Sequence, residues 1–160
     1  RNMATMGGSV ASKFGFSDII PALLAVHADI VTYKGGRMSM QEYMNYREKD
    51  ILVEIRIPNH EVPVAIEALR ISRGDFPYLT GSIRHDDTGY KIYIGTRPGA
   101  PQLAVKASAL LSEKGLAALD EAAQIASEEL VFQKNSHASK EYRVEMAKSM
   151  VRRLVKEVAQ

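Results

Sequence analysis

Small polar residues around two adjacent glycines form the segment of this sequence that is best suited to chemistry. Gly7 and Gly8 lack the side chains that would hold a ligand away from the main chain, and hydroxyl-bearing residues surround them. The segment reads Thr5-Met6-Gly7-Gly8-Ser9-Val10-Ala11-Ser12. A diphosphate or a polyhydroxyl chain fits there. The competing interpretation is a plain turn between a strand and a helix, because paired glycines are common.

Asp18 follows this segment, at the start of the apolar run of residues 19–26. Its carboxylate can cap a helix or accept hydrogen bonds from ligand hydroxyls, and capping is the more frequent use. Ser17 is an alternative cap. We expect a helix from this point to about Ala28, with Pro21 in its first turn and apolar residues on most sides.

Other candidate sites are weaker. The four histidines (His27, His60, His85 and His137) lie in different segments without ligand spacing, which argues against a metal site. Asp86 and Asp87 precede Thr-Gly, a pattern typical of a hairpin turn. No Walker sequence, dinucleotide fingerprint or Ser-His-Asp order occurs.

Composition excludes several classes of function. Lys and Arg total 21 against 19 Asp and Glu, and this balance does not favour nucleic-acid binding. Cysteine is absent, so the chain itself ligates no iron-sulfur cluster, and a cytoplasmic location is compatible. The run of residues 19–26 is far below the roughly 20 needed to cross a bilayer, so we expect no membrane insertion. Because the chain begins at Arg1, we interpret it as a fragment or a processed chain.

The elements that must position these residues fall into two parts, 1–61 and 62–160. In the first part we expect a turn rather than a helix over residues 3–12, a strand over 29–33, and a helix opened by Ser39 and Glu42 as a capping box. A strand over residues 51–57 should end at Pro58, with its odd-numbered apolar residues forming the buried face.

In the second part, strands are expected over residues 64–72, 79–85 and 90–96, followed by three helices. The first helix should begin at Pro101, the second is marked by Leu119 and Leu130, and the third begins after Ser139. Strands followed by segregated helices indicate an α+β fold.

Several of these stretches, in this order, resemble the FAD-binding subunit of the molybdenum hydroxylase family, which includes xanthine dehydrogenase and carbon monoxide dehydrogenase. Residues 2–12 are similar to its Thr-Ile-Gly-Gly-Asn-Ile-Ala motif, and residues 21–25 to its Pro-Ala-Leu-Leu-Ala helix. Further matches are Tyr46-Arg47, residues 50–58, residues 71–76 and Ser-Lys-Glu-Tyr-Arg at 139–143.

The resemblance implies the second half of a vanillyl-alcohol-oxidase-type FAD domain, followed by a small antiparallel-sheet-plus-helices C-terminal domain. It implies FAD as the cofactor, passing electrons from iron-sulfur clusters to NAD or another acceptor. The two-iron two-sulfur clusters and molybdopterin would belong to an iron-sulfur subunit and a molybdopterin subunit. Carried over by position, Thr5, Gly7, Gly8, Ser9 and Ser12 would contact the FAD diphosphate and ribityl region.

The resemblance also assigns three positions outside that segment. Asp18 would bind a ribityl or ribose hydroxyl, Leu52 would pack near the flavin or the adenine, and Arg70 lies near a basic position that faces the isoalloxazine. The sequence departs from the family in three places, one of which is a shorter loop between the Tyr46 helix and the Ile51 strand. Ser9 replaces the usual Asn, and Lys13-Phe14-Gly15-Phe16 replaces Ser-Pro-x.

The family's first flavin loop, a Gly-rich turn further upstream, has no counterpart in these residues, so we expect weak or no FAD binding by this chain alone. Three hypotheses remain. The chain is part of an FAD-binding electron-transfer subunit, a flavin-free docking module for sister subunits, or an unrelated α+β nucleotide binder. The resemblance implies that the hydroxylated substrate binds on another subunit.

Overall fold

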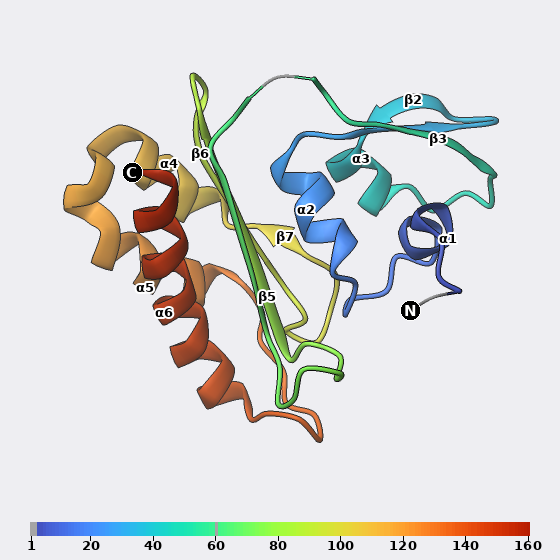
Figure 1. Ribbon diagram of the computed structural model, residues 1–160. Helices are drawn as coiled ribbons and strands as arrows, with labels where there is room; N and C mark the ends of the chain where they lie inside the picture. Colours follow the sequence, from blue (N-terminus) through green and yellow to red (C-terminus); the bar gives the residue numbers. More distant parts are fainter. Residues whose placement is uncertain (1–2, 60) are drawn as a thin grey trace.

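The computed structural model describes residues 3–59 and 61–160. It contains two antiparallel sheets, one with strand order β2-β1-β3 and one with order β4-β5-β6-β7. Figure 1 shows α4, α5 and α6 on one face of the larger sheet and α2 on the other, between that sheet and the smaller one. The predicted α+β class and the two-part, sheet-plus-helices architecture are confirmed.

The segment of the paired glycines is a helix, and our prediction of a turn was wrong. Helix α1 (Met6–Ala11) includes both Gly7 and Gly8. Thr5 caps it, since its side-chain oxygen accepts a hydrogen bond from the Gly8 amide at 3.0 Å. The helix ends before Lys13, which adopts a φ of 50°. Glycine's poor helix propensity is outweighed here by the cap and by the burial of Val10.

Helix α2 (Ile19–Ala25) is buried as expected but ends three residues before Ala28. His27 takes a left-handed φ of 55°, and the Ala28 amide donates to the Leu23 carbonyl at 2.9 Å. This arrangement is a Schellman motif, which usually uses glycine at the left-handed position. A histidine there gives no sequence signal for the helix end.

The smaller sheet combines β1 (Asp29–Thr32), β2 (Gly36–Ser39) and β3 (Leu52–Arg56). The expected capping box is present at α3 (Met40–Asn45), where Ser39 and Glu42 bond each other's main-chain amides. The predicted buried face of β3 was right only at Ile55 and wrong at its other apolar residues. The residues that pack on the core are Leu52 and Ile55, whereas Ile51, Val53 and Ile57 are exposed, because the pairing with β1 shifts register between Val31 and Thr32.

The larger sheet contains β4 (Val64–Leu69), β5 (Leu79–Asp86), β6 (Gly89–Gly95) and β7 (Gln102–Leu103). The β5–β6 hairpin turns at Gly89 with a φ of 94°, as the Asp-Asp-Thr-Gly sequence predicts. β4 ends three residues earlier than expected, because residues 72–75 form a turn in which the Ser72 amide donates to the Asp75 carboxylate at 3.1 Å.

Three helices cover this sheet: α4 (Val105–Lys114), α5 (Leu119–Glu129) and α6 (Lys140–Val158), with a short 3₁₀ turn (η1, Gly115–Ala118) before α5. Pro101 does not begin α4, contrary to our prediction. It precedes β7, and the first turn of α4 is capped instead by Glu129, which accepts from the Lys106 and Ala107 amides at 2.9 and 3.0 Å. A cap supplied from the end of α5 leaves no local sequence signal.

Candidate functional site

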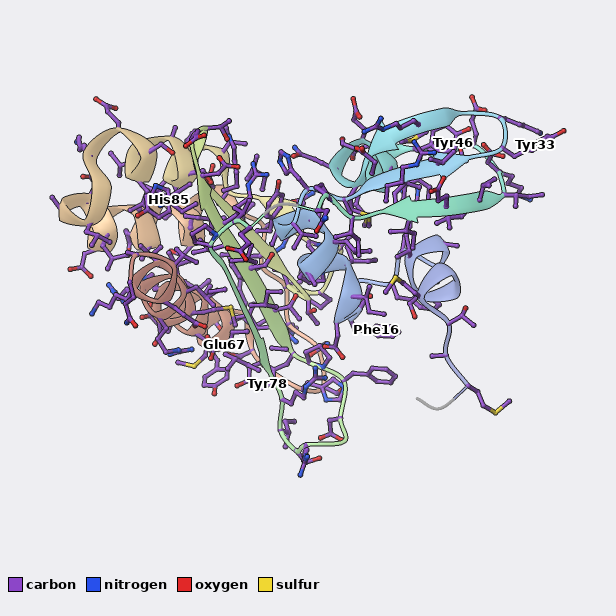
Figure 2. The ribbon with its side chains drawn as sticks, turned by 45° about the horizontal axis from the view of Figure 1, so that its top comes forward. Phe16, Tyr33, Tyr46, Glu67, Tyr78 and His85 are labelled. Atoms are coloured by element: carbon purple, nitrogen blue, oxygen red, sulfur yellow. The ribbon has the colours of Figure 1, made fainter. Side chains whose placement is uncertain are left out.

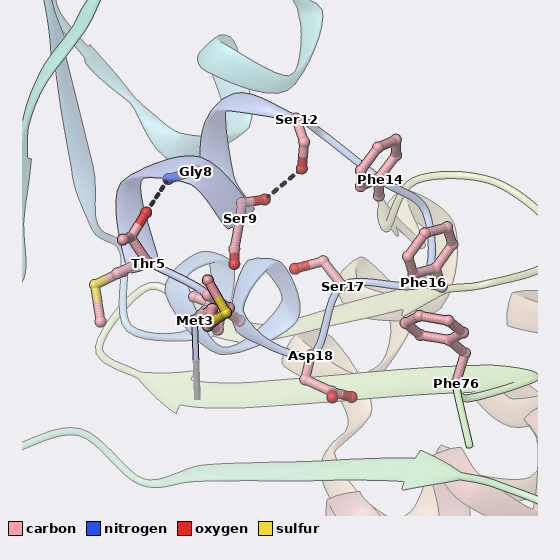
Figure 3. A pocket seen from close by; sticks show the side chains of 13 residues that line it. Met3, Thr5, Gly8, Ser9, Ser12, Phe14, Phe16, Ser17, Asp18 and Phe76 are labelled. Atoms are coloured by element: carbon pink, nitrogen blue, oxygen red, sulfur yellow. Dashed lines mark hydrogen bonds between the residues drawn. The ribbon is translucent and has the colours of Figure 1, made fainter. Parts of the chain in front are cut away.

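A pocket of about 650 Å³ opens between α1 and the start of α2. Figure 3 shows hydroxyl and carboxylate groups on one part of its wall and three phenylalanine rings on another. Its lining residues are Met3, Ala4, Thr5, Met6, Gly8, Ser9, Ser12, Phe14, Phe16, Ser17, Asp18, Ile19 and Phe76. A volume of this size accommodates a cofactor-sized ligand, for which pockets span roughly 300–1,000 Å³.

Five of the eight predicted cofactor residues line this pocket: Thr5, Gly8, Ser9, Ser12 and Asp18. Gly7 and Leu52 do not. A Cβ atom added to Gly7 would lie 3.9 Å from the Leu52 side chain, so these two residues pack α1 against β3 instead. Arg70 is also outside the lining, but it contacts Asp18. The structure therefore brings most of the predicted set together and gives the remainder supporting positions.

The hydroxyls of α1 are partly engaged in local bonds. The Thr5 hydroxyl oxygen accepts from the Gly8 amide, and the Ser12 hydroxyl donates to the Ser9 carbonyl at 3.0 Å (Figure 3). A Cβ on Gly8 would lie 3.0 Å from the Thr5 hydroxyl oxygen, which is closer than side chains ordinarily approach. Gly8 thus permits the Thr5 cap and leaves this wall of the pocket without a side chain.

Asp18 does not cap α2, although capping is the more frequent use of an aspartate at such a position. It occupies the cap position without a side-chain capping bond, and the Ser17 hydroxyl oxygen accepts from the Ile20 amide at 3.4 Å. The Asp18 carboxylate forms an ion pair with Arg70, 52 residues further along the chain. Arg70 also donates to the Asp75 carbonyl at 2.9 Å. The ion pair fixes the carboxylate at the pocket wall while part of it remains open to a ligand, since the Asp18 side chain is 36% exposed.

The sequence did not identify the aromatic residues of the pocket as site residues. In the sequence, Phe14 and Phe16 lie in a segment that departs from the family pattern, and Phe76 lies in the matching segment 71–76. The three rings lie in contact, with centroids 5.0 Å apart for Phe14 and Phe16 and 4.5 Å apart for Phe16 and Phe76. Two phenylalanines flanking a glycine were the available signal, but the partner ring comes from a distant segment.

A second cluster of polar groups lies outside this pocket, around Lys13, Tyr46 and Asp50. The Lys13 ammonium lies 4.1 Å from the centre of the Tyr43 ring and donates to the Tyr46 carbonyl, and burial together with Arg47 lowers the Lys13 pKa. Burial and a hydrogen bond to Asp50 raise the pKa of Tyr46 to about 12. Burial alone would raise the Asp50 pKa, but hydrogen bonds from the Gly35, Thr32, Ile51 and Lys34 groups hold it well below its usual range. The pKa shifts of Tyr46 and Asp50 thus have structural causes beside the β1–β2 turn.

The described part of the chain has neither a metal-binding cluster nor a membrane-spanning helix. Within residues 3–59 and 61–160, no group of His, Asp and Glu side chains has an arrangement that could hold a metal ion. Asp86 bonds Thr88 within its hairpin, as turn chemistry predicts, and His60 lies outside the described residues. Over the same part of the chain, no helix combines the length and apolar character needed to cross a membrane.

Solved structures share this fold over 99% of the chain. A carbon monoxide dehydrogenase from Hydrogenophaga pseudoflava has a TM-score of 0.85 at 24% identity, with 62% of that chain covered. Quinoline 2-oxidoreductase from Pseudomonas putida 86 has a TM-score of 0.83 at 19% identity, with 61% of that chain covered. The protein thus spans just over three fifths of the length of these solved chains.

Among curated proteins, one that is similar is the uncharacterized protein YgfM of Escherichia coli strain K12, with 28% identity over 87 residues, covering 54% of this chain and 34% of that protein.

Two family models match consecutive parts of the sequence. Residues 1–60 match the FAD binding domain in molybdopterin dehydrogenase, and residues 65–158 match the CO dehydrogenase flavoprotein C-terminal domain. The second match alone covers more than half of the chain. The chain therefore belongs to the family of the FAD-binding flavoprotein subunits of molybdenum hydroxylases, of which the carbon monoxide dehydrogenase flavoprotein is a member.

Proposed function

We propose that this chain is the FAD-binding, electron-transfer part of a molybdenum hydroxylase complex. The observation that carries the proposal is the pocket between α1 and α2, because five residues assigned to FAD by the family resemblance line it, all within the segment that matches the FAD-binding family model. We also propose a domain boundary between residues 61 and 62, which is supported by family matches that end at residue 60 and begin at residue 65.

The chemistry of the pocket suits most of an FAD molecule. Hydroxyls of Ser9, Ser12 and Ser17 and the carboxylate of Asp18 can bond the hydroxyl groups of a ribityl chain, and the phenylalanines suit a planar ring. None of the described residues that line the pocket is basic. Phosphate contacts would therefore depend on main-chain amides in this part of the site, which agrees with weak binding by the chain alone.

The residues of this chain would bind and orient the cofactor and would limit its contact with water. Bound FAD supplies the ability to take up electrons singly and to release them as a pair. We propose iron-sulfur and molybdopterin subunits as partners, NAD or another acceptor as the electron sink, and the cytoplasm as the location. The family assignment supports the proposal of such partners. We further propose an oxidoreductase activity for the complex, of which the xanthine dehydrogenase type is one form.

Replacement of Gly8 by Trp tests cofactor binding. The indole would occupy the pocket space beside Thr5. The affinity of the purified chain for FAD should therefore fall at least tenfold, as measured by flavin absorbance and fluorescence during a titration. Gly74→Trp is the matched control, because no atom lies within 4 Å of a Cβ at Gly74 and this residue is outside the pocket. Equal FAD affinities for the unmodified chain and the Gly8 variant would contradict the proposal.

The alternative function is a flavin-free docking module for sister subunits. Tyr33, Ile51 and Val53 favour it, because these apolar side chains of the smaller sheet are 76%, 69% and 60% exposed. Figure 2 shows Tyr33 at the outer end of this sheet, pointing away from the protein. Under this alternative, the purified chain would remain colourless with millimolar FAD yet would still co-purify with the co-expressed iron-sulfur and molybdopterin subunits.

A further inference from the structure

Three phenylalanine rings form a continuous aromatic wall along one side of the pocket. Phe14 and Phe16 are stacked with an angle of 13° between their planes, and Phe76 packs on Phe16 at 53°. The three side chains are 55%, 39% and 65% exposed in that order. Figure 3 shows that they come from two separate segments and line up beside Ser17 and Asp18. Large apolar rings that gather at an open pocket mark a surface where a ligand can pack.

The backbone that carries Phe14 and Phe16 is held in place by the second part of the chain. The Gly15 carbonyl accepts a hydrogen bond from the Thr96 hydroxyl at 2.8 Å. A Cβ on Gly15 would lie 2.7 Å from the carbonyl carbon of Gly99, so the two main chains touch. The rings therefore stay exposed although their backbone is fixed, which points to a preformed surface.

Phe76 is held by a different set of contacts. The residue before it, Asp75, accepts bonds from Arg70 at its carbonyl and from the Ser72 amide at its carboxylate. Because Arg70 also pairs with Asp18, the position of Phe76 is linked to the polar wall of the same pocket. One set of contacts thus positions both a carboxylate and a ring.

The pocket consequently has a polar part and an aromatic part side by side. Ser9, Ser12 and Asp18 provide the polar part, and the three rings provide the aromatic part (Figure 3). A ligand that matches both has a chain of hydroxyl groups joined to a planar conjugated ring. A ring of this kind gains stacking energy on phenylalanine in addition to the burial of apolar surface.

We infer that Phe14, Phe16 and Phe76 form the stacking surface for the isoalloxazine ring of the cofactor. This inference rests on the proposed function and extends it, because it assigns the flavin end of FAD, rather than the adenine end, to this side of the pocket. The loop of residues 13–17 then fixes the ring through its contact with Thr96 and Gly99. Thr96 and Gly99 of the second part thereby help to position the cofactor without touching it, whereas Phe76 of the same part would contact the ring directly.

Leucine substitutions at the three rings test the inference, since leucine keeps apolar bulk and removes the aromatic face. Binding of FAD, riboflavin and ADP is measured for Phe14→Leu, Phe16→Leu, Phe76→Leu and the unmodified chain, with ligand up to the millimolar range. Tyr33→Leu is the matched control, because Tyr33 is an exposed aromatic residue outside the pocket. Circular dichroism verifies that each variant is folded.

We expect each pocket variant to weaken the binding of FAD and of riboflavin by roughly three- to tenfold. The affinity for ADP should be unchanged in these variants, and all three affinities should be unchanged in Tyr33→Leu. Unchanged flavin affinity in all three variants, with a loss in Gly8→Trp, overturns the stacking surface and leaves the proposed function intact. A loss of ADP affinity without a loss of riboflavin affinity assigns the rings to adenine and also overturns the inference. If the unmodified chain binds neither flavin, both proposals fail for this chain.

Discussion

The two parts of this protein differ in how much of their stability is provided by an apolar core. Among the described residues, the core between the larger sheet and α4, α5 and α6 contains twenty buried apolar side chains, whereas the core beside the smaller sheet contains ten. One of those ten, Tyr93, belongs to the larger sheet. The first part therefore depends more on individual polar contacts and on its contact with the second part.

Arg143 tests the second part and should give the largest effect. Its buried guanidinium donates to the carbonyls of Tyr78, Gln133 and Ala138 and to the Asn135 side chain. Arg143→Ala would remove the guanidinium donors from all four acceptors, of which the Ala138 carbonyl and the Asn135 side chain keep main-chain donors, and should lower the free energy of unfolding by about 3 kcal/mol. Urea denaturation followed by circular dichroism measures this loss.

Arg153→Ala is the control for that experiment. Arg153 pairs with Glu67 at the surface, with a side chain that is 48% exposed, so its loss should cost less than about 1 kcal/mol. Equal losses in the two arginine variants would show that burial of Arg143 does not decide its contribution.

Gly15→Ala tests the contact between the two parts. The added methyl group would overlap the Gly99 main chain, which cannot move as a side-chain end can, and should cost about 1–3 kcal/mol. The same displacement of Phe14 and Phe16 should weaken flavin binding. Gly74→Ala, at a position with open space, should change neither property. Thermal unfolding together with riboflavin titration checks both expectations.

Asp50 tests the polar dependence of the first part and should give the smallest effect at neutral pH. Its carboxylate accepts main-chain hydrogen bonds from Lys34 and Gly35, which depress its pKa in the folded protein. A depressed pKa means that the ionised carboxylate stabilises the fold above its unfolded pKa of about 3.9, and that this stability is lost as the pH falls through the folded value.

Hydrogen exchange measured by NMR gives the readout for this prediction. Protection of the Lys34 and Gly35 amides should fall on acidification below pH 4, before the amides of β5 and β6 lose protection. Asp50→Asn should reduce protection at pH 7 and remove most of this pH dependence. An asparagine variant with the same acid response as the unmodified chain would rule out Asp50 as the cause.

Local sequence signals predicted much of the fold. The Ser39 and Glu42 capping box, the Gly89 hairpin and the start of α6 at the Ser139 cap each depend on residues within a few positions of one another, and all three are present. The register shift in β3 and the left-handed His27 left no local pattern, because pairing with β1 and packing around α2 decide them. At these two places the predictions failed because distant contacts outweighed local preference.

The candidate site divides in the same way. The sequence by itself determined that small and hydroxyl-bearing residues surround Gly8 and that a carboxylate follows at Asp18, because these groups lie within one short segment. Only the tertiary structure decided that Arg70 holds Asp18 and that Phe76 joins Phe14 and Phe16. Ion pairs and ring contacts act over a few ångströms, so they form only after the chain path has brought distant segments together.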